Sequence, residues 1–418
     1  MTSHVAHEYV SSNENLKLDN RSRFPFNVAG VCTLWRDILG DFPEYWTDLL
    51  ILVDNTFPTT ISELKLYVDF SKCLSINIKV TRTNPGVGVL VGDVVKYNEI
   101  VHTQAVIEVL RPHFRRCKSI HFDVLYDDSL PSVTRDLLPL SPDLQTLILK
   151  SVYENGTTQS NQQDSEDGQE VSRADPDIIF LSGKVALEVL NHRSLFTSDR
   201  WNRDITISTY SAPLDLELSA PLLSSITEKF NDVAHLTLEN LDIPFIDRNI
   251  ATPVWRPYHL RLVGLKPKFL SFLFKTDLSM VLFISIIDCT LNDNLPFLEA
   301  PNCDELELCR VRGDLGIVLA EWDGSALTFN DCDELTNEII HALTARIEAG
   351  RYIDLCRLKV INCLNFTPSV LLGLVVSFGR ARGICRVVVS GLTPPLSEND
   401  RTELQNLAGI LGWEGETL

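Results

Sequence analysis

LTFNDCDELTNEIIHAL, residues 327–343, and LKVINCLNFTPSVLLGLV, residues 358–375, share one pattern. Each begins with an alternating apolar triplet, continues through a polar residue and a cysteine, and ends in an amphipathic helical stretch. The two triplets are 31 residues apart, and so are Cys332 and Cys363. A strand, a turn and a helix that recur at the same offset predict a repeat architecture.

The same kind of triplet recurs along much of the chain. In the second half, triplets begin at Leu236, Leu260, Ile284, Leu306, Leu327, Leu358 and Val387. Their spacings of 24, 24, 22, 21, 31 and 29 residues are typical of leucine-rich repeats. Triplets at Ile120, Leu147 and Leu216 extend the series upstream with wider gaps. We therefore predict an α/β fold, a leucine-rich-repeat-like solenoid of parallel strands over residues 56–418.

Alternation along each strand also predicts a binding surface. The two outer residues of a triplet point into the core, so the middle residue and the residue after the triplet face the concave side. The positions that we expect to form one partner-binding strip are Thr237, Glu239, Arg261, Ser285, Glu307, Thr328, Asn330 and Lys359. Because arginine is common among the residues that dominate interfaces, we expect Arg261 to contribute most.

The N-terminal stretch VCTLWRDILGDFPEYWTDLL, residues 31–50, differs from the repeats. Apolar residues from Val28 to Leu39 fall on one face of a helix, with Asn27 as its N-cap and Pro43 after its end. We expect Trp35 and Trp46 either to be ordinary core residues or to belong to a docking module for another protein.

This stretch resembles the second half of the F-box in fungal, basidiomycete-type F-box-like proteins, in which V-C-x-x-W-R-x-I is followed by P-x-x-W and a strand. The residues on that pattern are Val31, Cys32, Trp35, Arg36, Ile38, Pro43 and Trp46. VLRPHFRRCKSIHFDV and SPDLQTLIL, further along, also resemble segments of those proteins. The resemblance implies a partial F-box module over residues 24–55, whose seven matching residues dock the Skp adaptor of a cullin-based ubiquitin ligase. It also implies that the concave face binds a target protein.

The first F-box helix, of the form L-P-x-E, has no match among the residues before Phe24. We therefore expect adaptor binding to be weak or conditional, or to need a helix encoded upstream of Met1. A ligase-independent leucine-rich-repeat scaffold that binds a protein partner is the alternative. Arg36, beside the apolar face, is expected to be exposed.

Composition narrows the function further. The chain has 418 residues and a net charge of −19, which argues against nucleic acid as a partner because phosphate binding needs a basic face. It has no export signal and no apolar run that could cross a membrane, so we expect a cytoplasmic or nuclear protein without a membrane partner. No catalytic or nucleotide-binding motif is present and the cysteines are scattered singly, so we expect no enzyme, cofactor or metal site.

Two segments lack the apolar residues that a core needs. Residues 1–23 are polar, and residues 154–177 hold an acidic, low-complexity run without aromatic residues. Such compositions cannot bury enough apolar surface to offset the entropy of ordering. We expect the first segment to be a disordered tail and the second a disordered insertion in the solenoid.

Overall fold

The computed structural model describes residues 25–54, 58–82, 93–138, 140–153, 178–182, 185, 188, 204–208, 233–241, 256–274, 278, 280–291, 303–320, 322–350, 355–381, 386–406 and 411–413. The tail predicted at residues 1–23 and the insertion predicted at residues 154–177 lie outside these residues.

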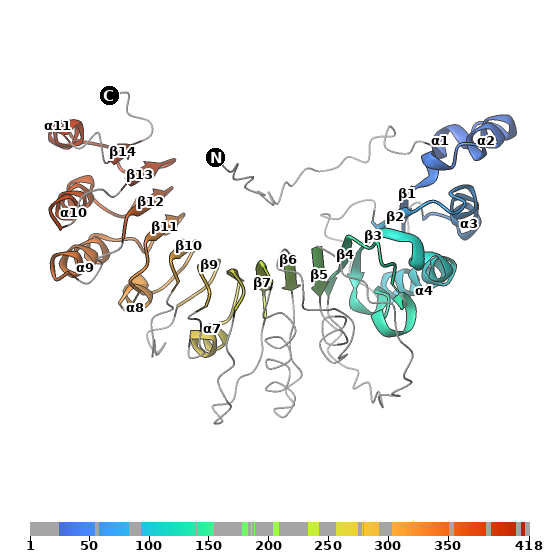
Figure 1. Ribbon diagram of the computed structural model, residues 1–418, viewed down its shortest axis with the longest axis horizontal. Coiled ribbons are helices and arrows are strands. Elements are labelled where there is room, and N and C mark those ends of the chain that lie inside the picture. The colour runs from blue at the N-terminus through green and yellow to red at the C-terminus, as the bar shows by residue number, and fades with distance from the viewer. Residues whose placement is uncertain are drawn as a thin grey trace.

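Within the described residues, fourteen parallel strands form one sheet whose order follows the chain. The sheet bends into an arc, with its strands on the inner side and its larger helices on the outer side (Figure 1). The strands are β1 (Asp48–Leu52), β2 (Ile76–Thr81), β3 (Cys117–Tyr126), β4 (Thr146–Tyr153), β5 (Ile178–Ser182), β6 (Asp204–Ser208), β7 (His235–Glu239), β8 (His259–Val263), β9 (Phe283–Ile287), β10 (Glu305–Cys309), β11 (Ala326–Asn330), β12 (Arg357–Ile361), β13 (Arg386–Ser390) and β14 (Leu411–Trp413).

The helices lie in the connections between these strands and before β1. They are α1 (Phe26–Ala29), α2 (Thr33–Gly40), α3 (Ile61–Phe70), α4 (Asp93–Leu110), α7 (Pro267–Phe274), α8 (Leu315–Leu319), α9 (Asn337–Glu348), α10 (Pro368–Ala381) and α11 (Glu398–Asn406). Short turns of helix are η2 (Pro43–Trp46), η3 (Arg111–Arg116), η4 (Asp127–Ser129) and η5 (Val133–Leu137).

The predicted triplets occupy equivalent places on neighbouring strands. Leu236, Leu260, Ile284, Leu306 and Leu327 follow one another in direct register from β7 to β11. Each is at most 2% exposed, so the row forms a continuous strip of core. The prediction of parallel, adjacent strands is confirmed.

Between the triplets at Leu147 and Leu236, the structure has two strands that the series does not contain. β5 and β6 carry the buried pairs Ile179 and Leu181, and Ile205 and Ile207, which alternate like the other triplets. The prediction placed no strand between Leu147 and Leu216, although both stretches alternate in the predicted way. The triplet predicted at Leu216 lies outside the described residues.

Each strand from β7 to β13 is followed by one residue in the left-handed backbone region. These residues, with φ in degrees, are Asn240 (52), Gly264 (60), Asp288 (53), Arg310 (50), Asp331 (51), Asn362 (54) and Gly391 (73). From Asn240 to Asn362, the backbone N–H donates to the last carbonyl of the next strand, for example from Asn362 to Ser390 at 3.0 Å. Glycine, asparagine and aspartate tolerate this conformation best, which explains most of the residues found there.

Side chains link these turns to one another. The amide oxygen of Asn362 accepts a hydrogen bond from the backbone N–H of Leu392 at 2.9 Å. A Cβ at Gly391 would lie 2.0 Å from that oxygen, and a Cβ at Gly264 would lie 2.2 Å from the amide oxygen of Asn240. Where the left-handed residue of one turn is asparagine, the left-handed residue of the next turn therefore has to be glycine. A larger residue would collide with the asparagine side chain, and glycine also adopts the positive φ without strain.

Cysteines follow three of the turns at buried positions. Cys289, Cys332 and Cys363 are at most 1% exposed. The Cys332 thiol donates to the carbonyl oxygen of Leu308 at 3.2 Å. Burial raises the pKa of Cys289 to about 11 and that of Cys363 to about 12, so both stay protonated near neutral pH. These three thiols are thus packed in the core.

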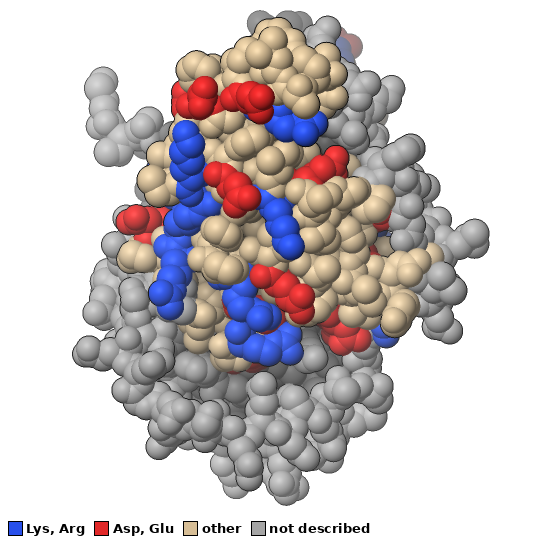
Figure 2. All heavy atoms as spheres, turned by 90° about the vertical axis from the view of Figure 1, so that its right-hand side faces the viewer, with Lys and Arg blue, Asp and Glu red and all other residues tan. Residues whose placement is uncertain are grey.

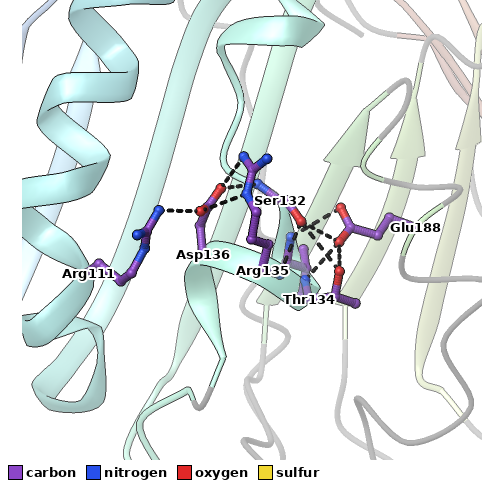
Figure 3. Close-up of polar contacts among 7 residues, drawn as sticks. Arg111, Ser132, Thr134, Arg135, Asp136 and Glu188 are labelled. Carbon is purple, nitrogen blue, oxygen red and sulfur yellow. Dashed lines mark hydrogen bonds and ion pairs between the residues drawn. The ribbon is translucent and has the colours of Figure 1, made fainter. Parts of the chain in front are cut away.

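A buried polar network fixes the turn η5 between β3 and β4 (Figure 3). The Asp136 side chain is fully buried and accepts hydrogen bonds from Arg111 at 2.7 Å and Arg135 at 2.8 Å. The carboxylate of Glu188 accepts from the Ser132 hydroxyl at 2.6 Å and from the Thr134 backbone N–H at 2.8 Å. The two acids thus tie this turn to η3 on one side and to the chain after β5 on the other.

The Asp136 contacts predict a pH-dependent stability. Burial alone would raise the pKa of Asp136, but hydrogen bonds from Arg135, the Ser132 backbone and Arg111 together hold it below its ordinary value. The unfolded chain therefore takes up a proton more readily, so stability is lost as pH falls through and below the ordinary Asp pKa of about 3.9. We expect Asp136→Asn to lower the free energy of unfolding by about 1–3 kcal/mol at pH 7.

That difference should shrink when urea unfolding of both proteins is repeated in steps from neutral pH down to pH values below about 3. A difference that stayed constant across this range would show that the Asp136 carboxylate charge does not stabilise the fold.

Candidate functional site

The N-terminal cap, residues 25–46, differs from the single helix that we predicted. α1 and α2 are separate helices, and Cys32 between them has an extended backbone with φ −162° and ψ 167°. Gly30 and the β-branched Val31 precede it, a sequence that favours a break over a continuous helix. Asn27 lies inside α1 and is no N-cap. The prediction failed because it followed apolar spacing and ignored the glycine.

Trp46 is the centre of the cap's core. It is fully buried and packs with Ala29 and Leu39. Its indole N–H donates to the carbonyl oxygen of Leu39 at 2.8 Å. The rings of Tyr67 and Phe70 in α3 lie against it, with centroids 5.4 and 4.9 Å away. Trp46 therefore joins the cap to the first repeat.

α3 is held in place at both of its ends. At its start, the Thr60 hydroxyl and the Glu63 carboxylate form a reciprocal capping box. At its end, the Arg116 guanidinium donates to the carbonyl oxygens of Val68 at 3.2 Å and Leu74 at 2.7 Å. A cation at a helix C-terminus is electrostatically favourable. α3 is thus a fixed support for Trp46.

Trp35, in contrast, is 48% exposed. It belongs to a group of exposed apolar side chains that we call the cap surface: Val31 (70%), Leu34 (65%), Trp35, Ile38 (40%), Phe42 (45%) and Tyr45 (45%). α1 and α2 contain only two charged residues, Arg36 and Asp37. In Figure 2 the top of the molecule, over these helices, is largely uncharged, whereas charges of both signs gather below it.

The seven residues predicted to dock an adaptor are thus divided. Val31, Cys32, Trp35 and Ile38 are exposed, Pro43 and Arg36 are partly buried, and Trp46 is buried. The Arg36 Nε donates to the carbonyl oxygen of Ala29 at 3.4 Å and so links α2 to α1, which corrects the expectation of a free, exposed charge. Leu34, Phe42 and Tyr45 were missed, because they are not among the residues of the pattern from which the docking residues were predicted.

On the concave side, most of the predicted strip forms one row. Six residues follow one another in direct register from β7 to β12, namely Thr237, Arg261, Ser285, Glu307, Thr328 and Lys359. Glu239 and Asn330 belong to a second row, two residues further along each strand. Val263, Ile287 and Cys309 separate them there, so these two residues do not extend the first row.

Ser285 is a correction to the prediction of a solvent-facing side chain, because it is only 3% exposed. Its hydroxyl donates to the Glu307 carboxylate at 2.8 Å and lies 2.9 Å from Nε2 of His259. The Ser285 hydroxyl donates its single proton to Glu307, so it can only accept a hydrogen bond from His259. Nε2 of His259 therefore carries a proton. Burial, with the charges of His235 and Arg261, lowers the pKa of His259 to about 4, so its ring is neutral at pH 7.

The residue before each triplet also faces the concave side, and the prediction missed this row. It contains Asp204, His235, His259, Phe283, Glu305, Ala326, Arg357 and Arg386. His235 pairs with Asp204, and its ring lies edge-on to that of His259 with centroids 5.5 Å apart. Extending the alternation by one residue upstream of each triplet would have identified the row.

The concave rows and the cap surface are the two candidate sites of the described residues. The concave rows place aromatic, acidic and basic side chains side by side on neighbouring strands. Among the residues described, no group of three or more His, Cys, Asp or Glu side chains could hold a metal ion. In the same residues, every helix is too short or too polar to cross a membrane. The chain matches no protein-family model and no curated protein.

Proposed function

We propose that this chain is the substrate-recognition subunit of a cullin-based ubiquitin ligase. The cap is a partial F-box module, and its surface docks the Skp adaptor. The remaining chain is a leucine-rich-repeat-like solenoid whose concave face binds the target protein. Such a subunit supplies binding and no catalytic step, needs no cofactor, and would act in the cytoplasm or the nucleus.

The observation that carries the proposal is the concentration of exposed apolar side chains on the cap. Within residues 31–45, six large apolar side chains are each at least 40% exposed. Contiguous exposed apolar patches mark interaction sites, since burying them in a partner is favourable by about 25 cal/mol per Å². A tryptophan within such a patch is a frequent centre of binding energy.

The second candidate is a scaffold that binds a protein partner without any ligase. It is favoured by the missing match to the first F-box helix, since that helix supplies part of the adaptor contact in the proteins that the chain resembles. The concave rows serve target binding equally well in both cases. The two functions differ only in what the cap surface binds.

Adaptor capture distinguishes them. We expect the full chain to retain the purified Skp adaptor in a pull-down, and Leu34→Asp to weaken this by about 1–3 kcal/mol because a carboxylate then lies in the apolar contact. Leu392→Asp is the matched control, since Leu392 is 68% exposed and Leu34 65%. Both variants should unfold at the same denaturant concentration as the parent.

Capture by a chain extended upstream of Met1, but not by the present one, would mean that the first helix is indispensable. If neither chain captured the adaptor, the ligase proposal would be wrong and the scaffold function would remain. Arg36→Glu is unsuitable as a probe, because Arg36 links α1 to α2.

A further inference from the structure

The concave face is locally basic at its C-terminal end, although the chain carries a net charge of −19. Arg357 and Lys359 of β12 and Arg386 of β13 alternate with the buried residues Leu358, Val360 and Val387, so all three cations face the concave side. Arg357 and Arg386 stand directly opposite each other in the register of the sheet. Adjacent strands are about 4.8 Å apart, so these charges are close neighbours.

Acidic side chains of the protein neutralise only part of this positive charge. Arg357 reaches across the small Ala326 of β11 and pairs with Glu305 of β10. Lys359 and Arg386 are exposed, and no ion pair to either is found within the described ranges. Like charges opposite each other destabilise a sheet, so an anionic group bound here would relieve an existing repulsion.

Apolar side chains lie beside these charges. Val388 is in direct register with Lys359, and Ile361 lies two residues beyond Lys359 on the same face. Both are partly exposed. The surface therefore offers cations around an aliphatic patch, on a sheet whose strands hold the side chains in fixed positions.

We propose that this end of the concave face binds an acidic peptide segment, in which Asp or Glu side chains contact Arg357, Lys359 and Arg386 and an aliphatic side chain contacts Val388 and Ile361. The inference rests on the proposed use of the concave face for target binding, and it is independent of what the cap binds. A nucleic acid is disfavoured, since Glu305 and Glu307 lie two strands away on the same face and would repel a continuous phosphate backbone.

The test uses the full chain and two fluorescein-labelled peptides. In one peptide Asp and Glu alternate with Leu, and in the other Asn and Gln replace the acids. Fluorescence anisotropy should show binding of the acidic peptide only, and this binding should weaken between about 50 and 300 mM salt because exposed charges are screened. The double variant Lys359→Glu, Arg386→Glu should bind at least about tenfold more weakly.

Lys266→Glu, Lys268→Glu is the matched control, because it changes the net charge equally on exposed residues at and just before the start of α7, outside the arc (Figure 1). Its affinity for the acidic peptide should equal that of the parent. Equal affinities of the two double variants would overturn the proposal, as would absent binding or tighter binding of a single-stranded RNA at the same site. Adaptor capture separates the two proposals. If the parent chain captured the adaptor but did not bind the acidic peptide, only this inference would be overturned. If it bound the peptide but did not capture the adaptor, only the ligase proposal would be overturned.

Discussion

Trp46→Ala is expected to lower the free energy of unfolding of the N-terminal cap by about 3–5 kcal/mol, whereas Trp35→Ala should change it by less than about 0.5 kcal/mol. Trp46 is fully buried between the cap and α3, and its truncation leaves a cavity and removes the hydrogen bond to Leu39. Trp35 is 48% exposed, so little packing is lost there.

Hydrogen exchange is the measurement, because a terminal unit of a repeat array can unfold separately. In Trp46→Ala the amides of α2 and η2 should lose protection, while those of β7 to β12 keep it. Trp46→Phe, which keeps most of the buried area, should fall between the two alanine variants. Equal loss of protection in Trp35→Ala and Trp46→Ala would contradict the division of the two tryptophans into surface and core.

Glu99→Ala should destabilise the protein by about 3–5 kcal/mol, because it leaves several buried donors unpaired. The Glu99 carboxylate, on α4, is buried and accepts from the backbone N–H groups of Leu125 and Tyr126, each at 3.1 Å. It also accepts from the hydroxyl of Ser129 at 2.8 Å. These bonds fix the chain where it leaves β3.

Glu99→Gln separates hydrogen bonding from charge. It keeps one carbonyl oxygen as an acceptor, so urea unfolding should show a loss of only about 1–2 kcal/mol. If the alanine and glutamine variants lost the same stability, the effect would come from the carboxylate charge and not from unpaired donors.

The sequence predicted the repeated strands well, because alternation and spacing are local properties. Leu260 or Leu306 can be placed in a core row without knowing what lies around it. β5 and β6 were missed although the same alternating pattern was present in their sequences.

The candidate sites depend on neighbours that are distant in the chain, which is why prediction was weaker there. Trp46 is a core residue partly because the rings of Tyr67 and Phe70, far along the chain, lie against it, and Trp35 has no such neighbours among the ring contacts of the described residues. Likewise, Ser285 is buried by partners on the strands to either side, His259 and Glu307. Spacing within one repeat carries no information about such cross-strand contacts.

The left-handed turns limit how such a protein can gain or lose repeats. In the core, the leucines of β7 to β12 are nearly interchangeable, so duplication or deletion of a unit would leave the interior intact. At the turns, each repeat depends on its neighbour. The turn with Gly264 has to come directly after the turn with Asn240, and the turn with Gly391 directly after the turn with Asn362. Arg310 pairs with Asp288 of the preceding turn. Removing the unit that carries Gly264 would bring the Cβ of Asp288 against the amide oxygen of Asn240. Recombination between repeats is therefore restricted to joints that keep these pairs together.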